Sequence, residues 1–132
     1  MAPVIHLDTH VVAWLWVGDR ARLEPVAGLI EGHELRISPM VTLELEYLHE
    51  IGRMTASGAT VVADLVARIG LGVSTTALCD VVARALDLRW TRDPFDRLIV
   101  ANAMTDGVSL LTRDATIRAN FARAVWGATT PG

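Results

Sequence analysis

The chain has 132 residues, 52% of them hydrophobic, which suits one domain with a buried core. Its formal net charge of −3 excludes a generally basic surface, so a nucleic-acid partner would need local arginines or a metal ion. The twelve basic residues are all arginine, which excludes lysine-dependent chemistry such as Schiff-base formation or the phosphate site of P-loop proteins.

The compartment and the redox state are also constrained by the sequence. No apolar run reaches the roughly 18 uncharged residues of a membrane span, and no cationic segment precedes the first apolar one. Cys79 is the single cysteine, and its place in a helical run predicts a packed thiol. We expect a cytoplasmic protein without a membrane partner, forming one domain over residues 1–132.

The first half of the chain alternates short β-rich runs with amphipathic helical stretches. In chain order, it predicts a strand at residues 4–7, helices at 9–17 and 21–31, a strand at 35–38, and helices at 39–53 and 55–69. Trp14 and Trp16 are two residues apart on one helix and cannot share a face, so we expect one of them to be exposed at an interface.

The second half continues the alternation. It predicts a strand at residues 73–75, helices at 77–88 and 94–106, a strand at 109–112, a short helix at 115–123, an edge strand at 124–126 and a frayed tail at 127–132. Strands separated by helices imply crossover connections. The fold class is therefore α/β, with a mostly parallel sheet covered on both faces.

Three aspartates fall where strands end or helices begin. Asp8 ends the first strand, Asp114 follows the strand at 109–112, and Asp96 lies in the first turn of its helix. Ligands of open α/β sheets bind beyond the carboxyl ends of the strands, where helix N-termini also point. We expect these three carboxylates to meet at one edge of the sheet.

Glu44 joins them by helical periodicity. It shares a stripe with Met40, Leu48 and other apolar residues, whereas Glu46 shares one with polar residues, so Glu44 is expected to face the core side. Asp8, Asp93 and Asp114 could instead be simple helix caps, with Asp96 as the acidic partner of a capping box. Glu44 has no capping role, which leaves a buried ion pair with an arginine or a metal site.

Clustered carboxylates suit the hydrolysis of phosphodiesters. Their oxygens are hard ligands for Mg²⁺ or Mn²⁺, and a cation is needed because bare carboxylates would repel a phosphate backbone. One or two ions could activate a water and stabilise the charge of the transition state. Cysteine and histidine spacings do not suit zinc, and His10, although close to Asp8, is expected to be a surface or packed histidine.

Four motifs occur in order along almost the whole chain, at residues 7–10, 37–45, 92–101 and 110–114. Together they resemble the PIN domain, particularly the bacterial VapC-like toxins. The first and third motifs are specific in combination, while the second and fourth are weak alone. Leu43 departs from the pattern, since similar sequences often carry an aromatic residue before the glutamate.

The resemblance implies a three-layer α/β/α sandwich around four to five short strands. It also implies a Mg²⁺-dependent endoribonuclease, with Mn²⁺ as a substitute, acting as the toxin of a type II toxin–antitoxin pair. The metal-binding and catalytic acids carried over by motif are Asp8, Glu44, Asp96 and Asp114. Asp93 is an extra acid whose role stays open between a cap, a support for the ligands and a ligand of a second ion.

Other residues are assigned more loosely. Thr112 is expected to orient the site or contact the substrate, and Arg97 and Arg113 to contact RNA phosphates, with surface ion pairing as the alternative for these arginines. The family implies an antitoxin partner and a homodimer. The rival functions are an RNA-processing nuclease outside a toxin–antitoxin pair, a small Mg²⁺-dependent phosphatase and a non-enzymatic binding domain.

Overall fold

The fold is built on a parallel sheet of five short strands, described here from a computed structural model that covers residues 1–127. The strand order is β3-β2-β1-β4-β5, and all four neighbouring pairs are parallel. The strands are β1 (Val4–Leu7), β2 (Glu34–Ile37), β3 (Gly72–Val73), β4 (Ser109–Leu111) and β5 (Ala124–Val125). The predicted α/β class with a parallel sheet is confirmed, including the edge position of the last strand.

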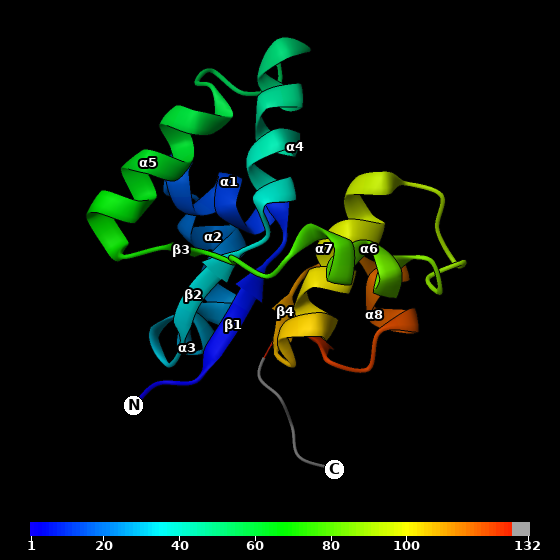
Figure 1. Ribbon diagram of the computed structural model, residues 1–132. Coiled ribbons are helices and arrows are strands. Elements are labelled where there is room, and N and C mark those ends of the chain that lie inside the picture. Colours follow the sequence, from blue (N-terminus) through cyan, green and yellow to red (C-terminus); the bar gives the residue numbers. More distant parts are fainter. Residues whose placement is uncertain (128–132) are drawn as a thin grey trace.

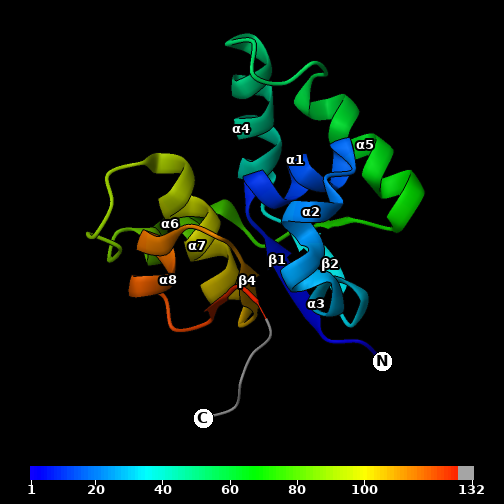
Figure 2. The same ribbon diagram turned by 180° about the vertical axis from the view of Figure 1, so that it is seen from behind.

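Helices cover the sheet on two sides. They are α1 (Thr9–Val17), α2 (Arg20–Leu23), α3 (Ala27–Glu31), α4 (Pro39–Glu50), α5 (Gly58–Ile69), α6 (Leu78–Ala85), α7 (Pro94–Asp106) and α8 (Ala115–Asn120). Figures 1 and 2 show α1, α2 and α3 on one side of β1 and β2, with α6 and α7 on the other. Such layers are what right-handed crossovers between parallel strands require.

Several predicted boundaries are wrong by a few residues, each for a local reason. The helix expected over residues 21–31 is interrupted by a 3-10 turn, Glu24–Val26, because Pro25 has no N–H to donate. The helix expected from residue 55 begins at Gly58, where the Ser57 hydroxyl caps the Thr60 N–H. The expected tail extends beyond the described residues, which end at 127.

Two predictions about single side chains are also wrong. Cys79 is exposed, because the buried side of α6 is formed by Val81 and Ala85. Trp14 and Trp16 are both half-buried, so neither is a fully exposed tryptophan. Trp14 packs against His10 and Trp126 instead, with ring centroids 4.9 and 5.9 Å away.

The order in which strands are added to the sheet reverses at β1, which lies between β2 and β4. The connection from β1 leads to β2 on one side, whereas the later chain returns to place β4 on the other side of β1. Leu7 pairs with Leu111, and the Asp8 N–H donates to the Leu111 carbonyl at 3.0 Å. Asp8 and Thr112 thus leave adjacent strands at the same edge, the switch point where open α/β folds bind ligands.

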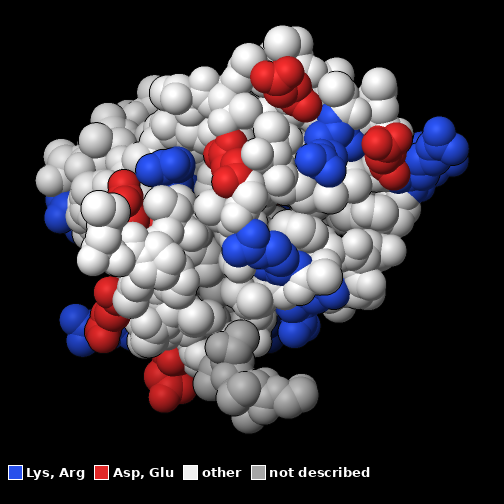
Figure 3. Space-filling view, turned by 60° about the horizontal axis from the view of Figure 1, so that its bottom comes forward, with Lys and Arg blue, Asp and Glu red and all other residues white. Residues whose placement is uncertain are grey.

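Surface properties complete the description. In the view of Figure 3, acidic and basic residues are interspersed, and neither sign forms a continuous field. Within residues 1–127, no helix is both long enough and apolar enough to cross a membrane.

Candidate active site

A pocket of about 290 Å³ lies at this switch point and is lined by all five predicted acids. Its lining residues are Asp8, Thr9, His10, Glu44, Leu48, Asp93, Asp96 and Asp114. They come from the ends of β1 and β4, the first turns of α1, α7 and α8, and the middle of α4. Helix N-termini direct N–H groups and positive dipole ends toward this pocket, which favours negative charge there.

Asp8 is the most buried of the acids, with 4% of its surface exposed. Its Oδ1 accepts a hydrogen bond from the Thr9 N–H at 2.8 Å, and its Oδ2 accepts one from the Thr112 hydroxyl at 2.7 Å. The same hydroxyl accepts from the Asp114 N–H at 3.1 Å. Thr112 is fully buried, so it holds Asp8 and Asp114 in place and has no surface to offer a substrate.

Glu44 reaches the pocket from the side of α4 that borders the buried line of Val41 and Leu45. The expectation that it faces the core is therefore corrected: it is half-buried and faces the pocket with Leu48. The Thr9 hydroxyl donates to its Oε1. Burial raises the pKa of Glu44, and the charges of Asp8 and Asp93 add to this, against the hydrogen bond from Thr9.

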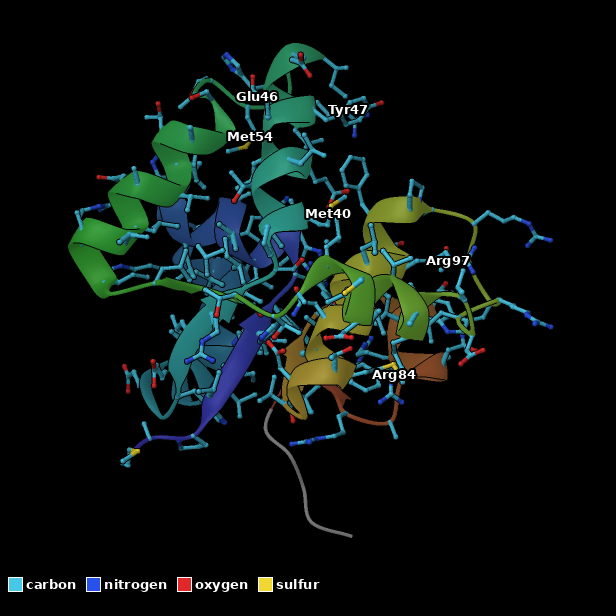
Figure 4. The ribbon with its side chains drawn as sticks, in the orientation of Figure 1. Met40, Glu46, Tyr47, Met54, Arg84 and Arg97 are labelled. Carbon is cyan, nitrogen blue, oxygen red and sulfur yellow. The ribbon has the colours of Figure 1, made fainter. Side chains whose placement is uncertain are left out.

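Glu46 lies on a different side of the same helix. Figure 4 shows Glu46 toward the start of α5, while Met40 and Tyr47 lie on the side of α4 nearer α7. The Gly58 N–H donates to the Glu46 Oε1 at 3.0 Å. The periodicity argument correctly separated the two glutamates, but Glu46 has a structural role at the N-terminus of α5.

Asp96 is the acid whose protonation is most perturbed. Burial raises its pKa to about 7, helped by the charges of Asp93, Asp8, Asp114 and Glu44. Its predicted stripe is confirmed, since Ile99, Val100 and Ala103 are all buried. The four neighbouring carboxylates concentrate negative charge in the pocket, a condition that favours a bound cation.

Asp93 and Asp114 are both helix caps and pocket residues. The Asp93 Oδ1 accepts from the N–H groups of Phe95 and Asp96, at 2.8 and 3.3 Å, and Asp93 is exposed. The Asp114 Oδ1 accepts from the Ile117 N–H at 2.9 Å. In each case capping occupies one carboxylate oxygen and leaves the other one available.

His10 is a packed histidine, as expected, since its ring lies on Trp14, and it also lines the acidic pocket. Its Nε2 accepts from the Arg113 N–H at 2.9 Å, and its Nδ1 lies 3.5 Å from the Asp8 Oδ2. Burial lowers its pKa despite the nearby charges of Asp8 and Asp114, which favours a neutral ring with the proton on Nδ1. Its position two residues after Asp8, in the first turn of a helix, was the available signal.

The predicted arginines divide into two cases. Arg97 donates through Nε and Nη2 to the Ala85 carbonyl, at 3.3 and 3.0 Å, and so caps the end of α6 away from the acidic pocket. Figure 4 shows it beside the loop that follows α6. Arg113 is exposed at the rim, with its Cζ 6.0 Å from the centre of the Trp14 ring.

The donor set suits a hard divalent cation, although the side chains do not yet enclose one. Among residues 1–127, no three His, Cys, Asp or Glu side chains are grouped closely enough to form a complete metal cage. Mg²⁺ does not need such a cage, because it keeps several waters and is commonly held by one or two carboxylates. Asp8, Glu44, Asp96 and Asp114 fit this mode, since one or two of them would bind the ion directly and the others would bind the waters that it keeps.

These features define a class of protein: a parallel α/β domain with a carboxylate pocket at its switch point, suited to divalent-cation chemistry on an anionic substrate. The chain belongs to the PIN domain family, which matches residues 5–122. It is 32% identical over 121 residues to Ribonuclease VapC22 of Mycobacterium tuberculosis, covering 86% of this chain and 89% of that protein.

Two solved structures share the fold. A chain of VapBC2 from Rickettsia felis, bound to a DNA fragment from its promoter, gives a TM-score of 0.66 at 15% identity, covering 93% of this chain and 98% of that one. A chain of DNA-bound VapBC from Salmonella typhimurium gives 0.63 at 18% identity, with coverages of 94% and 96%. At these identities the likeness concerns the fold alone.

Proposed function

We propose that this protein is a Mg²⁺-dependent endoribonuclease that acts as the toxin of a type II toxin–antitoxin pair. The observation that carries the proposal is the convergence of five carboxylates from distant parts of a PIN-domain chain on one pocket. The relationship to a protein named a ribonuclease supports RNA as the substrate class.

The geometry of the pocket supports the catalytic roles that we propose for its residues. Asp8, Glu44, Asp96 and Asp114 would hold Mg²⁺, with Mn²⁺ as a substitute, and Asp93 completes the negative lining at its exposed edge. A cation held there would reverse the local charge, lower the pKa of a water and stabilise the charge that develops on the phosphate. Thr112 and Thr9 orient Asp8 and Glu44 through their hydroxyls. Arg113, at the rim, binds a phosphate of the strand.

Protein partners are the second part of the proposal. VapBC complexes are the structural neighbours, which supports a cognate antitoxin. The proposal also includes a homodimer, as the resemblance to VapC-like toxins implies. Exposed apolar side chains on α4 (Leu43 and Tyr47), at the start of α6 (Leu78) and just after its end (Leu86) offer surfaces for such contacts. A toxin that cleaves cellular RNA acts in the cytoplasm, where we place this protein.

The test is cleavage of a mixed cellular RNA pool by partner-free protein with Mg²⁺, Mn²⁺ or EDTA. Asp96→Asn should lower the rate by at least about a hundredfold while preserving the fold, because it removes a ligand charge but keeps the side-chain shape. Circular dichroism checks the fold. Retained Mg²⁺-dependent cleavage in Asp96→Asn would sink the assignment of Asp96.

Two glutamates on one helix provide the matched control. Glu44→Gln should reduce cleavage strongly, since Glu44 lines the pocket. Glu46→Gln should leave cleavage nearly unchanged, because its amide oxygen can still accept from the Gly58 N–H. Comparable losses in both variants would overturn the assignment of Glu44.

A further inference from the structure

An aromatic and arginine cluster borders the acidic pocket on the side of α1. Trp14 is at its centre, with His10 and Trp126 packed against it at ring-centroid distances of 4.9 and 5.9 Å. The guanidinium Cζ atoms of Arg22 and Arg113 lie 5.4 and 6.0 Å from the centre of the Trp14 ring. The cluster thus joins α1, α2, the segment after β4 and the segment after β5.

The cluster is continuous with the acidic pocket. His10 belongs to both, since it lines the pocket and packs on Trp14. Its Nε2 accepts from the N–H of Arg113, the residue between Thr112 and Asp114. A polymer whose phosphate occupies the acidic pocket would therefore meet Arg113 and Trp14 directly beyond His10.

The two arginines are free to bind an external anion. Arg22 is exposed, and its ion pair with Asp19 is long, at 3.6 Å from Nε to Oδ2. Arg113 forms no ion pair with a carboxylate in the part of the chain that the structure describes, although Asp114 follows it. The cation–π contacts place the two guanidinium groups near the Trp14 ring. Because exposed ion pairs and cation–π contacts are weak, the charges of both arginines stay available to an anion.

We propose that Trp14, Trp126, Arg22 and Arg113 form a subsite for single-stranded RNA next to the acidic pocket. The arginines bind phosphates on either side of one nucleotide, and its unpaired base stacks on the exposed parts of the indole and guanidinium groups. This inference rests on the proposed ribonuclease function and specifies which residues outside the acidic pocket bind the strand.

The chemistry favours a single strand over a duplex. Bases in a duplex are stacked on each other, whereas unpaired bases are splayed out and bind to aromatic rings and guanidinium planes. Stacking on aromatic residues tolerates any base. The subsite therefore provides affinity and selectivity for single strands, and little recognition of sequence. The subsite also supplies local positive charge, which a chain with a net negative charge needs in order to attract RNA.

Binding is measured in the Asp96→Asn background, with Mg²⁺, by fluorescence anisotropy of a short fluorescein-labelled mixed-sequence RNA, single-stranded or annealed to its complement. We expect the single strand to bind more tightly. Adding Arg22→Gln should weaken its binding several-fold and reduce the slope of log affinity against log salt by about 0.7 for the lost phosphate contact.

Arg68→Gln is the matched control. Arg68 is as exposed as Arg22, at 55% against 56% of the side chain, and also pairs with an aspartate on its own helical turn. It lies on α5, and both substitutions remove one charge and one surface pair. Arg68→Gln should leave RNA binding unchanged. Equal affinities for Arg22→Gln and Arg68→Gln would overturn the subsite.

The stacking component has its own test. Trp126→Leu should weaken single-stranded RNA binding by at least about fivefold and have little effect on the duplex. Trp14→Phe keeps a ring at the centre of the cluster and should retain the preference for the single strand. Wild-type affinity in Trp126→Leu would contradict base stacking. Cleavage by the wild-type protein is scored separately, so failure of the nuclease proposal is distinguished from failure of the subsite.

Discussion

Single residues at this site serve two purposes at once. Asp8, Asp93 and Asp114 cap their helices, as the simpler interpretation of the sequence held, and they also line the acidic pocket. The two roles are compatible because a carboxylate has two oxygens and a helix N-terminus at the switch point faces the ligand. Capping fixes the direction of each carboxylate, which is the preorganisation that a metal site needs.

Sequence periodicity and spacing predicted that the acids meet, and the motif resemblance named Thr112 as a residue that orients the site, but neither gave the contacts that support each acid. Glu44 was found because a helix period separates it from Glu46. The contact of the Thr112 hydroxyl with Asp8 joins residues 104 positions apart, and that of the Arg113 N–H with His10 joins residues 103 apart. Such pairs depend on the strand order, in which β1 and β4 are neighbours, and local patterns carry no information about it.

Thr112→Val tests the role of the buried hydroxyl. Valine has nearly the same shape but cannot donate to Asp8 or accept from the Asp114 N–H, so both carboxylates lose orientation. We expect activity to fall by about 10- to 100-fold and the Mg²⁺ concentration for half-maximal cleavage to rise. A Mg²⁺ titration of the cleavage rate measures both effects.

Thr112→Ser is the companion variant. It restores the hydroxyl and should recover most of the activity and the wild-type Mg²⁺ dependence. If Thr112→Val titrates with Mg²⁺ as the wild type does, the hydroxyl is not a positioning group.

At the scale of elements, the long periodic helices were predictable and the tight contacts between helices were not. The predicted helix over residues 94–106 is confirmed, because Asp93, Pro94 and Gly107 mark both of its ends. The start of α5 was misplaced because it depends on contact with α4. A Cβ added to Gly58 would lie 2.3 Å from the Thr42 carbonyl oxygen and 2.8 Å from the Glu46 nitrogen.

Gly58→Ala should therefore destabilise the fold. The clash is with backbone atoms, which cannot rotate away, so we expect a loss of about 1–3 kcal/mol in the free energy of unfolding, measured with urea. Gly28→Ala is the control, since a Cβ there has no neighbour within 4 Å and alanine favours the helix. An unchanged midpoint for Gly58→Ala would show that α4 and α5 are packed less closely than described.

At the scale of the whole molecule, a second acidic group ties the two sides of the fold together. Asp106 ends α7, and its carboxylate accepts hydrogen bonds from the hydroxyls of Ser74 and Thr76 and from the Asn102 amide. The His6 Nε2 on β1 lies 2.9 Å from its Oδ2. This carboxylate thus links the segment after β3 to α7 and the central strand. Its hydrogen bonds offset the unfavourable interaction of a negative charge with the dipole at the C-terminus of α7.

The protonation of Asp106 should make the fold sensitive to acid. Burial alone would raise its pKa, but hydrogen bonds from Thr76 and Ser74 and the neighbouring His6 outweigh burial and hold the pKa below its ordinary value of 3.8. His6 itself stays neutral near pH 7, because burial lowers its pKa and Arg36 adds to this, against the attraction of Asp106. A depressed acid pKa contributes stability that is fully present above the unfolded value and is lost as the pH falls through the folded value.

Asp106→Asn should cost about 1.5–3 kcal/mol at pH 7, since hydrogen bonds to a charged acceptor are replaced by poorer ones. The difference from the wild type should shrink as the pH falls below about 4, because the wild-type carboxylate is then protonated as well. Urea unfolding of both proteins from pH 7 to pH 3 measures this. Asp64→Asn, which removes only an exposed pair with Arg68, should cost less than about 1 kcal/mol. A difference for Asp106→Asn that stays constant with pH would mean that the side chain acts through its shape and not its charge.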